Sequence, residues 1–134
     1  MFVDASAMVA ILAREEEDVA LFRCLEAARE PITSALAIFE TASAICRKKR
    51  LSVEAAEAEV RGLLKQACIR VVPMTDDEAH GALAAYARYG KGRGHPAQLN
   101  MGDCFAYACA QAHDVPLLFI GNDFSQTDIP SALA

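Results

Sequence analysis

The stretch MFVDASAMVAIL, residues 1–12, decides the fold because it joins a strand to a helix at an acid. Residues 1–3 are apolar and β-prone, and Asp4 ends the run. From Ser6 to Leu12 the apolar side chains recur at helical spacing, which predicts a helix. A buried strand that turns through an acid into a helix is typical of the start of a βαβ unit. We therefore expect strands and helices to alternate along the chain.

The rest of the sequence continues this alternation. Short apolar strands are expected at 31–34, 69–73 and 115–120, and helices at 15–29, 35–50, 52–67, 75–89 and from 100 to between 111 and 113. A turn with a short last strand is expected at 125–129. This pattern predicts an α/β fold, a single-domain α/β/α sandwich with a short parallel sheet, over residues 1–134.

Composition narrows the classes of protein. No apolar run is long enough to cross a membrane and no signal-peptide layout is present, so we expect a cytoplasmic protein without a membrane partner. The five cysteines, without a Cys-x-x-Cys, are typical of reduced buried thiols rather than a zinc site. The net charge of −5 argues against a protein that binds nucleic acid over its whole surface. It is compatible with a nuclease whose acids surround a metal ion.

Four acids stand at strand ends or helix starts. Asp4 and Asp123 lie just past expected strands, while Glu40 and Asp103 lie in or near the first turns of helices. Because the carboxyl ends of parallel strands share one edge, the four are expected on one rim. Small and apolar helical neighbours place Glu40 on the inward face of its helix. Taken alone, Asp103 is equally well a helix-start acid, three residues after the expected cap Asn100.

Carboxylates gathered in this way must either raise one another's pKa or hold a cation. Two of them about 5 Å apart repel by roughly 3 kcal/mol at an effective dielectric of about 20. Ligands that are all oxygen suit Mg²⁺ or Mn²⁺. Such metals serve in phosphodiester hydrolysis, so the acids favour a nuclease. Gly102, just before Asp103, is expected to let the backbone pass close to its surroundings.

An irregular basic segment, residues 89–96, precedes the Asp103 helix. Its charge contrasts with the acidic whole, which favours contacts from Lys91 and Arg93 to phosphates, although a plain connector has the same composition. The basic residues 47–50 are interpreted as cations at a helix end, with a phosphate patch as the alternative. A Cys104 nucleophile with His95 as base is a further alternative, but nothing supplies a group to orient the histidine.

Several of these segments together resemble a PIN domain, and more closely the VapC-like ribonuclease toxins of bacterial toxin–antitoxin pairs. They are residues 3–7, Glu40, residues 90–105 and residues 117–128, and the resemblance covers essentially the whole chain. It implies a Mg²⁺-dependent endoribonuclease, with Mn²⁺ as a possible substitute. It also implies inhibition by a small VapB-like antitoxin and a homodimer. Carried over by motif, the metal ligands are Asp4 and Asp103, and the further acids are Glu40 and Asp123.

The sequence departs from the family pattern at three places. Ala5 stands where threonine is common, Gly94 is an extra residue in the basic segment, and Asn122 stands where relatives tend to have an acid. The last departure leaves the fourth acid open between Asp123 and Asp128. The alternatives in other classes are a catalytically inactive PIN-like module that binds RNA or a partner, and a phosphatase or receiver-like aspartate site.

Overall fold

Four short parallel strands form the centre of the computed structural model, which describes residues 1–133. The strands stand in the order β3-β2-β1-β4, which places β1 in the interior of the sheet. They are β1 (Phe2–Val3), β2 (Ile32–Ser34), β3 (Arg70–Val72) and β4 (Leu117–Leu118). Phe2 pairs with both Ile32 and Leu117. The parallel sheet expected from the sequence is confirmed.

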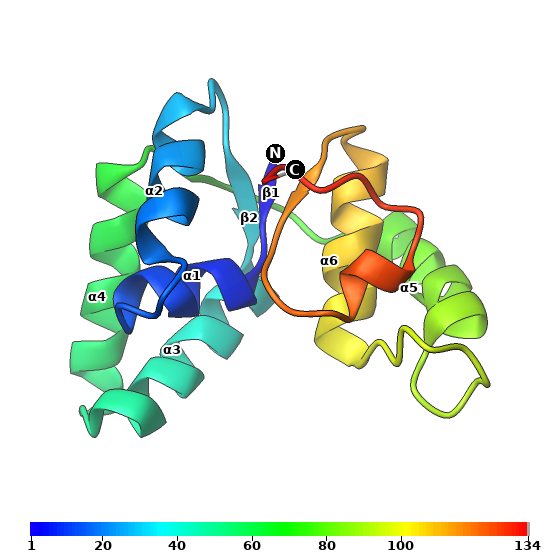
Figure 1. Cartoon of the computed structure of the whole chain (residues 1–134), viewed down its shortest axis with the longest axis horizontal. Coiled ribbons are helices and arrows are strands. Elements are labelled where there is room, and N and C mark those ends of the chain that lie inside the picture. Colours follow the sequence, from blue (N-terminus) through cyan, green and yellow to red (C-terminus); the bar gives the residue numbers. More distant parts are fainter. Residues whose placement is uncertain (134) are drawn as a thin grey trace.

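Helices cover both faces of this sheet. Figure 1 shows α1, α2, α3 and α4 on one side of the strands, and α5 and α6 on the other. Their bounds are α1 (Ala5–Leu12), α2 (Asp18–Ala27), α3 (Ala35–Lys49), α4 (Val53–Gln66), α5 (Asp76–Tyr89) and α6 (Met101–Ala112). The α/β/α sandwich is therefore confirmed. Within residues 1–133 no helix is both long and apolar enough to cross a membrane.

Side-chain caps fix where the helices begin, and the cap expected at Asn100 is confirmed. Ser34, Ser52, Thr75 and Asn100 each accept a hydrogen bond from a backbone N–H in the first turn of the helix that follows. Each such cap stabilises its helix by about 1 kcal/mol. Asp4 caps α1 in the same way. Because β1 ends directly at this cap, the carboxylate of Asp4 is held at the carboxyl edge of the sheet.

Two expected elements differ from the structure. The second helix begins at Asp18 rather than Glu15, because Arg14 takes a left-handed conformation (φ 54°) and residues 13–17 turn before the chain can coil again. No strand forms at 125–129. Instead Phe124–Gln126 make a short 3₁₀ turn, η1, and Leu117 bridges to Ser131.

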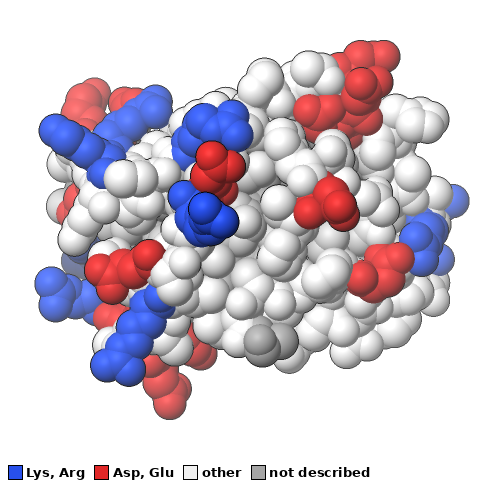
Figure 2. Space-filling model, turned by 90° about the horizontal axis from the view of Figure 1, so that it is seen from above, with Lys and Arg blue, Asp and Glu red and all other residues white. Residues whose placement is uncertain are grey.

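The central strands lie inside the core of the sandwich. Phe2, Val3, Leu117 and Leu118 have no exposed surface, and each such burial contributes about 1.5–3 kcal/mol. Figure 2 shows the face opposite the carboxyl ends of the strands: basic side chains gather toward the α2 and α4 side, where they are interspersed with acidic ones. This face therefore offers no continuous basic surface to a polyanion across the part that the described residues form.

Candidate active site

Asp4 is the most enclosed of the acids at the carboxyl edge of the sheet. It is 4% exposed, and its Oδ2 accepts hydrogen bonds from the Ser6 N–H (3.0 Å) and the Ser6 hydroxyl (2.6 Å). The same hydroxyl accepts a bond from the Ile120 N–H, so Ser6 also ties the end of β4 to this turn. Burial raises the pKa of Asp4, while the two bonds from Ser6 oppose that rise.

Glu40 reaches this edge from the second turn of α3. Its carboxylate packs against Gly102 in the first turn of α6, where a β-carbon would lie 2.6 Å from Cδ of Glu40. The absence of a β-carbon at Gly102 thus makes room for this close approach, as expected. Burial raises the pKa of Glu40 to about 7, helped by the charges of Asp4 and Asp103. These effects outweigh the attraction of the α6 N-terminus for an anion, which is worth about 0.3–1 kcal/mol.

Asp103 is both a capping residue and a member of this acidic group. Its Oδ2 accepts a hydrogen bond from the Asn100 N–H (3.1 Å), while Asn100 Oδ1 accepts one from the Asp103 N–H (2.8 Å). This reciprocal pair is a capping box. Burial raises the pKa of Asp103 to about 6; the hydrogen bond from the Asn100 N–H opposes that rise, and the charges of Asp4 and Asp123 add to it. The capping role of Asp103 is therefore confirmed, and its carboxylate also lies within the electrostatic influence of two other acids.

The two candidates for the fourth acid have different surroundings. Asp123 is exposed at the start of η1, and its charge contributes to the raised pKa of Asp103. Asp128 instead accepts a hydrogen bond from Tyr107 and pairs with Arg88. Its charge is not among the causes that raise the pKa of Asp103. Asp123 is therefore the acid that shares the electrostatic field of the group.

The acids are close enough to affect pKa values within the group, but their side chains are not arranged as a complete metal-coordination site. Among residues 1–133, no three His, Cys, Asp or Glu side chains are arranged as ligands around a common point. Asp4, Glu40 and Asp103 nevertheless come from three different elements, and the charge of Asp4 raises the pKa of both Glu40 and Asp103. Their donor atoms are all carboxylate oxygens, which fits the chemistry of Mg²⁺ or Mn²⁺. A cation would also remove the repulsion between them.

The basic segment is closed at its base rather than loosely connected. Gly90 and Leu99 form a bridge, and the Lys91 N–H donates to the Leu99 carbonyl (2.9 Å). Lys91 and Arg93 are exposed, and the Arg93 guanidinium lies over the Tyr86 ring at 5.6 Å. The base of the segment leads directly into the cap of α6. Two exposed cations are therefore presented close in the chain to Asp103.

Cys104 and His95 do not form a nucleophile–base pair. Cys104 is buried and its thiol pKa is raised by that burial. The His95 Nδ1 accepts a hydrogen bond from the Ala97 N–H (3.1 Å), and its ring packs edge-on against Tyr89. Both side chains therefore have structural roles, and the nucleophile alternative is not supported.

The basic residues at the end of α3 are largely engaged by neighbours. Lys49 pairs with Glu59 at 2.7 Å, Lys48 lies 3.9 Å from Glu15, and Arg47 donates to the Ser43 hydroxyl. These contacts favour helix-end cations over a phosphate patch at residues 47–50.

Comparison with known proteins gives one family and close relatives. Residues 1–130 match the family described as "PIN domain". Ribonuclease VapC42 of Mycobacterium tuberculosis is 40% identical over 132 residues, covering 98% of each chain. Ribonuclease VapC28 of the same species is 39% identical over 133 residues, covering 99% of this chain and 98% of that protein.

A solved structure has the same fold. The crystal structure of Mycobacterium tuberculosis VapC20, described as a Sarcin-Ricin loop cleaving toxin, superposes with a TM-score of 0.75. The match covers 96% of this chain and 95% of VapC20 at 18% sequence identity. At this identity the likeness shows the fold alone.

The close approach of Glu40 to Gly102 can be tested by Gly102→Ala. The added methyl group must displace the Glu40 carboxylate, which is the flexible end of its side chain, so the fold should survive. Moved toward water, Glu40 should titrate closer to its ordinary value of 4.5 than to about 7, measured by carboxyl NMR in metal-free protein. Gly62→Ala on α4 is the matched control, since its β-carbon meets nothing within 4 Å. An unchanged Glu40 pKa in Gly102→Ala would contradict this geometry.

Glu40→Gln should make the stability of the metal-free protein less dependent on pH. Folding raises the pKa of Glu40 from 4.5 to about 7, so the folded state binds more protons than the unfolded state between these values. Stability therefore falls as the pH rises through this window, and glutamine removes that loss. At pH 8 we expect the variant to be more stable by about 1 kcal/mol, allowing for the partial exposure of Glu40, and at pH 4 equal.

Urea unfolding in the presence of a chelator measures this difference. Glu26→Gln, at an exposed acid on α2, is the matched control and should leave the pH profile of the parent protein unchanged. An equal gain from Glu40→Gln at both pH values would show that packing, rather than charge, is responsible.

Proposed function

This chain belongs to the PIN-domain family, and we propose that it is a Mg²⁺-dependent endoribonuclease, the toxin of a type II toxin–antitoxin pair. Relatives about 40% identical over nearly their whole length are named VapC ribonucleases, which supports cleavage of RNA. The observation that carries the proposal is the convergence of acids from separate elements. Asp4 at the end of β1, Glu40 on α3 and Asp103 on α6 lie at a single edge of the sheet, where the charge of Asp4 raises the pKa of the other two.

Each residue of this group has a distinct part in the proposed reaction. Asp4 and Asp103 would hold the divalent cation, with Mn²⁺ as a substitute for Mg²⁺, and Glu40 and Asp123 would complete the acidic rim around it. Such a cation, when bound, lowers the pKa of its water and stabilises charge on phosphate oxygens. The turn bonds from Ser6 and Asn100 orient the carboxylates of Asp4 and Asp103.

Lys91 and Arg93 are proposed to bind the RNA backbone. They are the exposed cations of the segment that leads into α6, in a protein whose net charge is −5. A phosphate bound to Lys91 and Arg93 would be attracted by the basic segment and would lie beside the acidic rim. This arrangement gives a localised electrostatic contact, which suits a protein whose opposite face mixes both signs (Figure 2).

Exposed apolar surface supports protein partners, proposed to be a small VapB-like antitoxin and a second copy of the chain. A groove of about 450 Å³ between α5 and α6 is lined by Leu83, Tyr86 and Met101 among others, and Leu83 is 68% exposed. A second groove between α3 and α4 is lined by Phe39 and Val53, which are also exposed. Apolar patches of this kind commonly mark protein interfaces.

Asp103→Asn should abolish RNA cleavage without unfolding the protein. Asparagine can still accept the hydrogen bond from the Asn100 N–H, but it removes the charge that would hold the metal. Cleavage by the parent protein should require Mg²⁺ or Mn²⁺ and stop in excess EDTA. Asp114→Asn, the same substitution at an exposed acid beyond the other end of α6, is the matched control and should remain active.

The same measurements distinguish the alternatives. Undiminished cleavage in excess EDTA would overturn the metal mechanism. RNA that is bound but never cut by the parent protein would favour the inactive PIN-like module. An active Asp103→Asn with a lowered melting temperature would leave Asp103 as a capping residue only.

Replacing both Lys91 and Arg93 with alanine should weaken RNA binding and flatten its dependence on salt. Two lost phosphate contacts should reduce the slope of log K against log salt by about 1.4 for single-stranded RNA. Binding is measured with the Asp103→Asn protein so that the RNA stays intact. Arg61→Ala with Lys65→Ala on α4 removes the same charge elsewhere and is the matched control. Equal slopes for both double variants would show that the basic segment is only a connector.

A further inference from the structure

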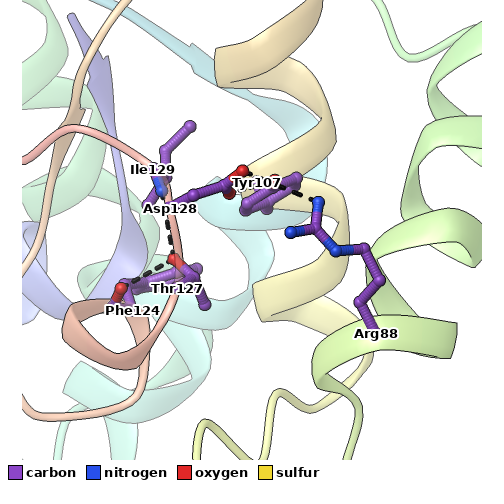
Figure 3. A network of polar contacts seen from close by, with 6 residues as sticks. All are labelled: Arg88, Tyr107, Phe124, Thr127, Asp128 and Ile129. Carbon is purple, nitrogen blue, oxygen red and sulfur yellow. Dashed lines mark hydrogen bonds and ion pairs between the residues drawn. The ribbon is translucent and has the colours of Figure 1, made fainter.

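The loop that carries Asp123 is anchored at its far end by a polar network drawn in Figure 3. At its near end the loop follows β4, where Asp4 N–H bonds to the Leu118 carbonyl and the Ile120 N–H bonds to Ser6. At its far end the Asp128 Oδ1 accepts a 2.5 Å hydrogen bond from the Tyr107 hydroxyl. The loop is therefore held from both sides.

Asp128 joins the C-terminal segment to two helices. Tyr107 lies on α6, is only 3% exposed, and directs its hydroxyl at the carboxylate. Arg88, near the end of α5, lies with Nη1 3.6 Å from Asp128 Oδ2. Both charged partners are more than half exposed, so this ion pair is the weaker link. The bond from the buried hydroxyl is the stronger one, because losing its acceptor would leave Tyr107 unsatisfied.

Tyr107 stands one helical turn after Asp103. Residues four apart on a helix share a face, so α6 presents Asp103 and Tyr107 on the same side. Tyr107 binds Asp128 by a hydrogen bond, and Asp123 stands at the start of η1, five residues earlier in the same loop. The loop from Asp123 to Asp128 therefore runs alongside one face of α6.

The turn between these two acids is stiffened internally. The Thr127 hydroxyl and N–H both donate to the Phe124 carbonyl, at 2.7 and 3.0 Å, and the Ile129 N–H donates to the Thr127 hydroxyl. The Phe124 side chain is buried and packs against Phe119 with ring centroids 5.2 Å apart. Because the turn is stiff, fixing Asp128 also restricts where Asp123 can lie.

We infer that Asp128 is a positioning residue and not an acid of the metal site: through Tyr107 it fastens the loop to α6 and thereby holds Asp123 beside Asp103. This rests on the proposed function for its effect on RNA cleavage, but not for its structural part. It assigns separate roles to the two acids that the sequence left as alternatives.

The first test compares Tyr107→Phe, Asp128→Ala and Asp128→Asn. Phenylalanine removes only the donor, alanine removes the acceptor, and asparagine keeps an acceptor oxygen while losing the charge. We expect amide hydrogen exchange at residues 120–129 of the metal-free protein to rise about tenfold in Tyr107→Phe and Asp128→Ala, and to stay near the parent value in Asp128→Asn. RNA turnover should fall about tenfold in the first two and be retained in the third.

A matched control separates anchoring from general destabilisation. Thr33→Val deletes another buried hydroxyl, which donates to the Val3 carbonyl in the sheet. It should lower the melting temperature by a similar amount without raising exchange at residues 120–129. Arg88→Gln should have only a small effect, like Arg61→Gln at the exposed pair on α4.

The second test asks whether the anchor acts through Asp123. In an Asp123→Asn protein, adding Tyr107→Phe should still raise exchange in the loop but should cost no further turnover. A full additional loss of turnover would overturn the positioning role.

The remaining outcomes are equally decisive. If Asp128→Asn is as inactive as Asp128→Ala while Tyr107→Phe retains activity, Asp128 is an acid of the site and the inference is wrong. Unchanged exchange at residues 120–129 in Tyr107→Phe also overturns it. If the parent protein cleaves no RNA but exchange rises as expected, the proposed function fails and the anchoring still holds.

Discussion

The main physical constraint on this structure is that it holds several carboxylates close together in a partly buried site. Asp4, Glu40 and Asp103 each lose solvation, and the charge of Asp4 raises the pKa of the other two, so the unliganded site opposes folding at neutral pH. The sheet order makes this arrangement possible. With β1 in the interior of the sheet, its carboxyl end lies between the start of α3, which follows β2, and the segment that follows β4. The core and the helix caps must supply the stability that the acids remove.

The capping interactions hold the carboxyl groups in defined positions even though the burial of these acids destabilises the fold. Asp4 and Asp103 each use Oδ2 to accept a backbone N–H from their own turn, so the fold fixes the position of both carboxyl groups without neutralising them. Gly102 contributes by what it lacks, because the absent β-carbon leaves room for the Glu40 carboxylate. Local helix signals and the geometry of the site are therefore produced by the same residues. A cation at this rim would add attraction to a frame that is already built.

The sequence predicted the features that have local signals. Alternating apolar segments predicted the parallel sheet and its helices, and Asn100 predicted the start of α6, because a cap acts within three residues. The start of α2 was placed wrongly, since nothing in the sequence marks the left-handed Arg14. The contact between Tyr107 and Asp128 joins residues 21 apart, and no periodicity reports such a pair. The roles of Asp123 and Asp128 therefore required the structure.

The two C-terminal acids also differ in how they respond to pH. The hydrogen bond from Tyr107, with help from Arg88, lowers the pKa of Asp128, so its carboxylate stays charged where Glu40 (about 7) and Asp103 (about 6) change protonation. The acceptor of the Tyr107 hydroxyl therefore keeps its protonation state while the acidic rim titrates. A change in pH near neutrality then acts on the charge of the rim and not on the position of Asp123. Position and charge are thus controlled by different residues.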